Sequence, residues 1–409
     1  DPQGGINLPA AWNQFNGSGI VVGVVDTGVR PHADLLPNLL AGHDFITNAQ
    51  MAADGSARDG DASDAGDWAQ ANECGIGTSA RPSSWHGTHV AGTIAASTNN
   101  GVGVAGVAWG AKLLPLRALG KCGGNLSDIA DAVVWGSGGT VPGLPKNPHP
   151  ARVLNLSLGG PGDCADSKTL QSAFRYAQQR GVVTVVAAGN SQAQASGFSP
   201  ANCPGALVVA AINREGTRAF YSNFGTIVDI AAPGGDVNRD GGIWSTLNSG
   251  ATQPAADAYA ALQGTSMAAP HVSGVVALML QADPQLSPAD VQARLKATSR
   301  PFPQSCNGCG AGIVNAHAAV NNLPTLVVNT SGTGTGTVSS DGAGLQCASA
   351  CWGNFAIGQT VTIRALAAPG SVFKSWSGAC SGTSPVCVLP VKARSEVGAQ
   401  FLIQPKTKS

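Results

Sequence analysis

Short apolar segments rich in β-branched residues alternate with segments of helical period over the first three quarters of the chain. The β-branched segments predict buried strands at 19–25, 112–118, 153–158, 182–188 and 206–212. The helical patterns predict helices at 128–136, 168–180, 267–282 and 288–297. Strands joined by crossover helices form a largely parallel sheet that is covered on both faces. The sequence therefore predicts an α/β fold, whose functional residues gather at the carboxyl ends of the strands.

The pattern changes after residues 315–324, where the helical period ends. Turns rich in Gly, Ser and Thr then separate short alternating segments at 336–340, 360–365, 372–376 and 397–401. This pattern predicts a small all-β domain that carries four of the cysteines. We expect one domain at 1–322 and a second, β-rich domain at 323–409.

The charge of the chain excludes several classes of partner. It has 23 basic and 23 acidic residues, and only 11% of its residues are charged. This balance argues against a nucleic-acid surface and against a polybasic membrane patch. The longest apolar stretch, near 272–280, is too short to be a transmembrane segment. Because the chain begins at Asp1 without an initiator Met or signal peptide, we expect a mature, secreted form.

Ten cysteines form an even set that is spread along the chain. Such a set indicates up to five disulfide bonds in an oxidising compartment. Cys306 and Cys309 also have the C-x-x-C spacing of redox and metal sites. No second C-x-x-C and no βαβ redox context accompanies them, which favours a structural disulfide.

Four polar residues stand where a predicted strand ends or a predicted helix begins. Ser266 leads into the apolar helix, where free N–H groups and the positive end of the helix dipole favour developing negative charge. Asp26 and Asn190 each end a buried strand, and His86 precedes a helix of small residues. Taken singly, Asp26 and Asn190 are more simply turn or cap residues, and a lone histidine is more simply structural; that interpretation is kept for His89.

Together these four segments resemble the subtilase (subtilisin-like) serine peptidases, with Asp, His and Ser in that order over residues 3–318. The resemblance implies a three-layer subtilisin-like fold and a secreted serine endopeptidase of broad specificity, which works through an acyl-enzyme. It makes Asp26, His86 and Ser266 the catalytic triad and Asn190 the oxyanion-hole side chain. It also implies protein or peptide substrates, an N-terminal propeptide during maturation, and a monomer.

The resemblance extends to the substrate-binding segments. Ser157, Leu158 and Gly159 match the family segment that pairs with substrate backbone, and Gly123 and Gly124 precede Leu126 in the opposing segment. A peptide between the two would add a strand through main-chain hydrogen bonds, which tolerates many sequences. Asp163 and Asp166 follow on a loop and could favour basic substrate residues, although a solvated loop is the simpler interpretation.

Residues 98–106 match the calcium loop of many subtilases. The resemblance implies a set of oxygen ligands, which suits calcium. These are the carbonyls of Thr98, Val102 and Val104, the Asn100 side chain, Asp34 and Gln3. The alternative is an ordinary Gly-rich surface loop.

A second calcium site is predicted in an acidic segment between the Asp26 and His86 motifs. Its five carboxylates would repel one another unless they are spread in water or neutralised by a cation. They are Asp54, Asp59, Asp61, Asp64 and Asp67. Residues 236–241 have EF-hand-like spacing without the final acidic residue, so a solvated loop is favoured there. We expect one to three structural calcium ions.

Sequence does not fix the disulfide connectivity. A local scheme pairs neighbours in the chain: Cys74–Cys122, Cys164–Cys203, Cys306–Cys309, Cys347–Cys351 and Cys380–Cys387. The tail resembles the divergent internalin-type B repeats, small β modules associated with surface or matrix attachment. Trp352 and Trp376 could form a binding platform there, but core positions are favoured in so small a module.

Two other functional classes compete with the endopeptidase. A catalytically inactive subtilase could act as a binding protein, but all four catalytic residue types are kept. A lipase or esterase would need G-x-S-x-G, and Ala268 stands where the second Gly would be.

Overall fold

We describe a computed structural model of the chain, which defines residues 3–342 and 344–404. The chain folds into two compact units. The first comprises residues 1–292 and 302–310, and the second comprises residues 293–301 and 311–409.

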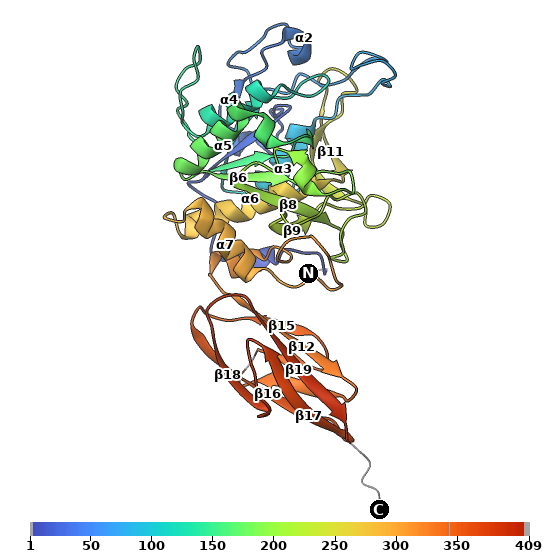
Figure 1. Cartoon of the computed structure of the whole chain (residues 1–409). Helices are drawn as coiled ribbons and strands as arrows, with labels where there is room; N and C mark the ends of the chain where they lie inside the picture. The colour runs from blue at the N-terminus through green and yellow to red at the C-terminus, as the bar shows by residue number, and fades with distance from the viewer. Residues whose placement is uncertain (1–2, 343, 405–409) are drawn as a thin grey trace, which may run out of the picture. The chain divides into compact units, whose positions relative to one another are not determined.

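The first unit is built on a seven-stranded sheet in which every neighbouring pair of strands is parallel (Figure 1). The five strands predicted from sequence are all in it, and their observed ends differ from the predicted ends by at most two residues. Across the sheet the strands are β2 (His43–Asp44), β3 (Lys112–Arg117), β1 (Val21–Asp26), β4 (Val153–Leu156), β6 (Val183–Ala187), β8 (Ala206–Ile212) and β9 (Ile230–Pro233).

Helices cover both faces of this sheet, because the order of the strands reverses at β1. The connection from β1 to β3 runs one way across the sheet, and the connection from β4 to β6 runs the other way. Right-handed crossovers therefore place α3 (His86–Ala95) on one face and α5 (Lys168–Gln179) on the other. α6 (Thr265–Ala282) packs beside α3, and α4 (Leu126–Gly136) packs beside α5. The predicted three-layer α/β fold is confirmed.

α6 begins two residues earlier than the sequence indicates. A start at residue 267 would place Pro270 in the first turn, whereas the observed start at Thr265 places it inside the helix, in its second turn. A proline there removes the hydrogen bond to the carbonyl four residues before it, which belongs to Ser266. That carbonyl becomes part of the functional site.

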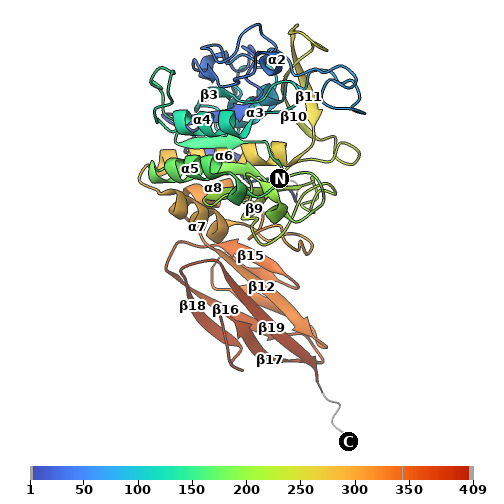
Figure 2. The ribbon, with the colours of Figure 1, turned by 45° about the horizontal axis from the view of Figure 1, so that its top comes forward.

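An antiparallel hairpin of β10 (Ile243–Asn248) and β11 (Asp257–Leu262) was not predicted. It lies beside α3 in both ribbon views (Figures 1 and 2). Gly92 of α3 allows this approach, because a side chain there would collide with Ser245 and Thr246. His89 is fully buried at this contact, with Nε2 3.0 Å from the Ile243 carbonyl and 3.1 Å from the Ala260 carbonyl.

The remaining elements of this part of the chain are short, except for the helix α7. They are α1 (Leu8–Trp12), η1 (Leu36–Asn38), α2 (Ala49–Ala52), β5 (Gly160–Pro161), η2 (Cys164–Asp166), η3 (Ala195–Gly197), β7 (Phe198–Ser199) and α7 (Pro288–Thr298). In the described part of the chain, no helix is both long and apolar enough to cross a membrane.

The second unit contains α8 (Ala316–Val320) and two four-stranded sheets. One sheet has the order β15 (Cys351–Asn354), β12 (Thr325–Gly332), β19 (Ser395–Ile403) and β17 (Ser371–Gly378). The other has the order β14 (Gln346–Cys347), β13 (Gly336–Ser340), β16 (Gln359–Ala367) and β18 (Val386–Val391). Trp376 belongs to the apolar core of this unit, as favoured from the sequence.

The ten cysteines form five disulfide bonds, in the pairs of the local scheme. Three of them lie within the first unit: Cys74–Cys122, Cys164–Cys203 and Cys306–Cys309. The other two, Cys347–Cys351 and Cys380–Cys387, lie within the second.

Buried His89 predicts a specific dependence of stability on pH. Burial lowers the pKa of His89 from 6.5 to about 4. Between these two pH values His89 is protonated in the unfolded chain and neutral in the folded chain. The free energy of unfolding therefore falls as the pH falls through this window. We expect the protein to lose roughly 3 kcal/mol relative to His89→Gln between pH 6.5 and 4, measured by urea unfolding. Parallel pH profiles of the two proteins would contradict the assignment.

Candidate active site

The reversal of strand order at β1 opens a crevice at the carboxyl ends of the central strands. Asp26 is the last residue of β1, Ser157 follows β4, and Asn190 follows β6. His86 is the first residue of α3, which leads from this edge of the sheet. The topology thus brings residues from distant parts of the sequence to one edge.

Asp26 and His86 form a direct hydrogen bond. The imidazole Nδ1 lies 2.8 Å from Oδ1 of Asp26, whose side chain has no exposed surface. The same oxygen accepts the backbone N–H of Thr27 at 2.8 Å. An ionised carboxylate can only accept, so Nδ1 of His86 carries the proton and Nε2 is left to act as a base.

Opposing effects act on the pKa of His86. Burial lowers it, but the Asp26 carboxylate raises it by its charge and its hydrogen bond, and Asp67 and Asp64 raise it further. The net result is a pKa above the ordinary value of 6.5. The carboxylates therefore stabilise the imidazolium that forms when the base takes up a proton.

Ser266 and Ser157 exchange two hydrogen bonds. The Ser266 hydroxyl donates to the Ser157 carbonyl at 3.1 Å, and the Ser157 hydroxyl donates to the Ser266 carbonyl at 2.8 Å. That carbonyl is available because Pro270 has no N–H to offer it. The Ser266 hydroxyl is thus directed at Ser157, and in the described part of the chain it makes no hydrogen bond to His86.

The side-chain oxygen of Asn190 is held by hydrogen bonds, and its amide nitrogen has no hydrogen-bond partner among the described residues. Its Oδ1 accepts from the backbone N–H of Thr265 at 2.9 Å and from the Thr265 hydroxyl at 2.8 Å. The Thr265 hydroxyl in turn accepts the N–H of Gly189 at 3.1 Å. Because its oxygen is occupied, the exposed Asn190 presents Nδ2 beside the first turn of α6.

A cleft of about 780 Å³ runs past His86. All six residues predicted to bind substrate line it: Gly123, Gly124, Leu126, Ser157, Leu158 and Gly159. Asp67 and Arg81 lie on its lining, and so do Asp163 and Asp166. The cleft brings the two predicted backbone-pairing segments to the same space as the imidazole.

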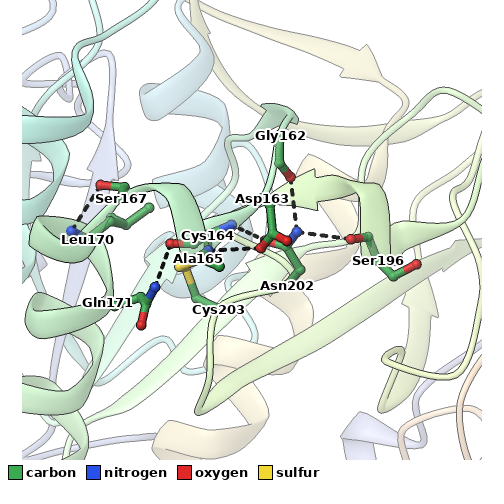
Figure 3. The surroundings of a disulfide bond; sticks show 10 residues. All are labelled: Gly162, Asp163, Cys164, Ala165, Ser167, Leu170, Gln171, Ser196, Asn202 and Cys203. Carbon is green, nitrogen blue, oxygen red and sulfur yellow. Dashed lines mark hydrogen bonds between the residues drawn. A yellow bond between two sulfur atoms is a disulfide. The ribbon is translucent and has the colours of Figure 1, made fainter.

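Disulfides brace both walls of the cleft. On one wall, Cys74–Cys122 lies next to the ion pair of Lys121 with Glu73, whose charged atoms are 3.0 Å apart. On the other wall, Cys164–Cys203 lies beside Asn202 (Figure 3).

Asn202 joins the segments on either side of this second disulfide. Its Nδ2 donates to the carbonyls of Gly162 and Ser196 at 3.0 and 2.9 Å, and its Oδ1 accepts from the Cys164 N–H at 3.1 Å. These hydrogen bonds hold the loop after Gly160 in place, and Asp163 and Asp166 on it are exposed to solvent.

The loop at 98–104 surrounds a buried carboxylate. Asp34 is 1% exposed, and it accepts from Asn100 Nδ2 at 2.7 Å, from the Val104 N–H at 3.2 Å and from the Tyr259 hydroxyl at 3.4 Å. No Lys or Arg pairs with it among the described residues. Two of the predicted ligands, Gln3 and Val102, are exposed.

Each of the five carboxylates of the acidic segment accepts from protein donors, and Asp54 and Asp59 share the Ser56 hydroxyl. Asp54 pairs with Arg117 of β3, Asp59 accepts from the Ser56 hydroxyl at 2.6 Å, and Asp61 accepts from the Ser63 N–H at 2.9 Å. Asp64 accepts from Thr27, and Asp67 accepts from Ser84. No group of three or more His, Cys, Asp or Glu that could hold a metal occurs in the described ranges.

Three contributors to the site were not singled out from the sequence: Thr27, Thr265 and Ser157 as a hydroxyl donor. Thr27 and Thr265 each stand next to a predicted catalytic residue, at Asp26 and at Ser266. That adjacency was the available signal, but a threonine beside a strand end is also an ordinary turn residue.

The comparisons with known proteins give the family. Residues 17–344 match the family model described as the subtilase family, and residues 326–404 match the model described as the divergent InlB B-repeat domain. A solved structure of a protease from Pseudoalteromonas arctica is 55% identical, covers 78% of this chain and 94% of that one, and superposes with a TM-score of 0.76.

Two curated relatives are bacterial proteases. An extracellular protease of Xanthomonas campestris pv. campestris is 57% identical over 318 residues, or 77% of this chain and 53% of that protein. An extracellular basic protease of Dichelobacter nodosus is 46% identical over 327 residues, or 78% of this chain and 53% of that protein. The chain thus spans about half the length of these relatives. Its match to the family model over residues 17–344 establishes that this chain belongs to the subtilase family.

Proposed function

We propose that the chain is the working part of a secreted serine endopeptidase of broad specificity. The observation that carries this proposal is the 2.8 Å hydrogen bond between buried Asp26 and the imidazole of His86, at the mouth of a cleft lined by the predicted substrate-binding segments. The names of the relatives support it. In this proposal residues 1–322 are the peptidase domain and residues 323–409 are a separate β domain.

Peptide hydrolysis assigns a task to each group. Ser266 attacks the substrate carbonyl while Nε2 of His86 takes its proton, and the imidazolium later protonates the leaving amine. Asp26 holds the tautomer that makes Nε2 the base and stabilises the charged ring. Nδ2 of Asn190 and the N–H of Ser266 donate to the oxyanion of the tetrahedral intermediate.

One local rearrangement is part of the proposal. The Ser266 hydroxyl donates to the Ser157 carbonyl at 3.1 Å, and it must turn to Nε2 of His86 for catalysis. Catalytic hydrogen bonds often tighten only when substrate is present. A substrate backbone laid along Ser157–Gly159 would also bring new donors and acceptors to that segment.

Localisation and partners follow from the same proposal. Three disulfides in the first unit suit an oxidising compartment, and the two relatives are named extracellular. We therefore propose secretion, with protein or peptide substrates. We also propose, from the family resemblance alone, an N-terminal propeptide, a monomeric state and surface or matrix contact through the β domain.

We also propose one structural calcium ion at the loop of residues 98–104. The fit is supported by Asp34, whose buried negative charge has no cationic partner among the described residues. Asp34, Asn100, Gln3 and the carbonyls of Thr98, Val102 and Val104 would hold the ion, which would neutralise that charge and fix the loop. A second ion at Asp54, Asp59, Asp61, Asp64 and Asp67 stays a prediction.

Replacing Ser266 tests the nucleophile. Ser266→Ala should lower kcat on a peptide substrate by at least about 10⁴-fold while leaving the melting temperature unchanged, because the residue is lost as a nucleophile but not as a helix former. A fluorophosphonate probe should label the unchanged protein at this residue. A protein that takes no label and hydrolyses nothing would favour the inactive, binding form of the family.

The pKa of His86 predicts the acidic limit of activity. Below its pKa the imidazole is protonated and cannot accept the Ser266 proton, so kcat/KM should fall through a midpoint above pH 6.5. Asp67→Asn removes a charge that raises this pKa and should move the midpoint to lower pH. Asp163→Asn removes a charge from the same cleft that is not among the causes, and should leave it in place. Equal shifts in both variants would refute the assignment.

Calcium removal tests the loop of residues 98–104. In the Ser266→Ala background, which prevents self-digestion, EGTA should lower the melting temperature by roughly 5 °C or more, measured by calorimetry. Asp34→Asn should lower it in calcium and abolish the response to EGTA. Asp166→Asn, an exposed carboxylate, should retain the full response. The same melting temperature in calcium and in EGTA would rule out the site.

A further inference from the structure

Asp64 differs from the other carboxylates of the acidic segment. Its side chain is buried, with 1% of its surface exposed. Both of its oxygens accept from protein donors: Oδ2 from the Thr27 hydroxyl at 2.6 Å, and Oδ1 from the Gly66 N–H at 2.9 Å. Because the carboxylate is buried and accepts both hydrogen bonds, it fixes the orientation of the Thr27 hydroxyl and of the Gly66 N–H.

The Thr27 hydroxyl also contacts the start of α3. It accepts the backbone N–H of Gly87 at 3.0 Å, in the first turn of the helix. The residue at the N-cap position, Trp85, has a left-handed backbone (φ 50°) and makes no side-chain cap hydrogen bond. A hydroxyl has one proton, so donating it to Asp64 turns the oxygen lone pairs toward Gly87. Thr27 therefore caps α3 from the end of β1.

The backbones at this point are in direct contact. A side chain at residue 87 would collide with the Gly28 carbonyl, and a Cβ at residue 28 would lie 2.6 Å from the Ala62 carbonyl and 2.8 Å from the Asp64 nitrogen. The Val29 N–H donates to the same Ala62 carbonyl at 3.1 Å. These close contacts couple three segments, so that a displacement of one would displace the others: the end of β1, residues 62–66 and the start of α3.

We propose that Asp64 is a positioning residue for the proposed triad. Thr27 adjoins Asp26, and Gly87 adjoins His86, so the path from Asp64 through the Thr27 hydroxyl to Gly87 runs parallel to the Asp26–His86 hydrogen bond. It holds the imidazole at its distance from the Asp26 carboxylate. Asp64 itself touches neither His86 nor the substrate. This inference rests on the proposed peptidase function.

A double-mutant cycle tests the path. The proteins are the unchanged chain, Asp64→Ala, Thr27→Val and the double variant. They are assayed at pH 8.5, above the pKa of about 7 to which burial raises Asp64. Values of kcat and KM are expressed per active site, titrated with a fluorophosphonate. Each single variant should lower kcat by about 10- to 100-fold with little change in KM, because misplacement of the base affects the chemical step.

The double variant distinguishes a shared path from two separate effects. If Asp64 acts through Thr27, the double variant should be no slower than the slower single variant. Thr27→Ser, which keeps the hydroxyl, should retain far more activity than Thr27→Val. Asp131→Ala removes a carboxylate that pairs with Arg58 and should leave kcat unchanged. If Asp64→Ala does not fold, Asp64→Asn, which keeps the shape, replaces it.

Two results would overturn the inference. In one, the losses in kcat multiply in the double variant. In the other, kcat per titrated site is unchanged and only the number of titratable sites falls, which would reduce Asp64 to a folding role. Failure of the proposed function is seen separately, because an unchanged chain that takes no probe and hydrolyses no peptide fails before any variant is compared.

Discussion

A carboxylate with no exposed surface, that of Asp26, ends β1, and the arrangement of the site depends on the hydrogen bonds that it accepts. Asp26 takes the Thr27 N–H and the His86 imidazole on one oxygen, while its Oδ2 has no hydrogen-bond partner among the described residues. A buried carboxylate without a hydrogen-bond partner is costly in free energy. The hydrogen bond from the His86 imidazole reduces that cost, which favours the imidazole in this position. The start of α3, the Thr27 hydroxyl and the close backbone contacts at Gly28 and Gly87 all serve to keep it there.

Much of the fold could be predicted because the buried strands are recognisable in the sequence as short runs of apolar, β-branched residues. Runs such as 183–187 and 206–212 are buried throughout and apolar except for Thr184, as expected for a sheet covered on both faces. The hairpin of β10 and β11 was missed because its residues are mixed in polarity and partly exposed. The helix predicted from residue 267 starts at Thr265, and the carbonyl of Ser266 in its first turn accepts from the Ser157 hydroxyl.

The site was predicted in its chemistry but not in its supporting contacts. Asp26, His86, Ser266 and Asn190 lie at the carboxyl edge that the topology defines. The acidic segment shows the limit of local reasoning. Within that segment only Arg58 is basic, but the structure brings Arg117 from β3 to Asp54 and Asp44. Neutralisation by distant arginines is a tertiary fact that the pattern of a segment does not contain.

In the β-rich unit, the first and last strands, β12 and β19, are parallel neighbours. Had they been antiparallel, the polypeptide would leave the sheet beside the point where it came in. Parallel pairing instead carries it out at the far side of the sheet, about one strand length away, or roughly 25 Å for eight residues. The polypeptide therefore crosses this unit from one end of the sheet to the other, and its points of entry and exit are separated by the length of the sheet itself.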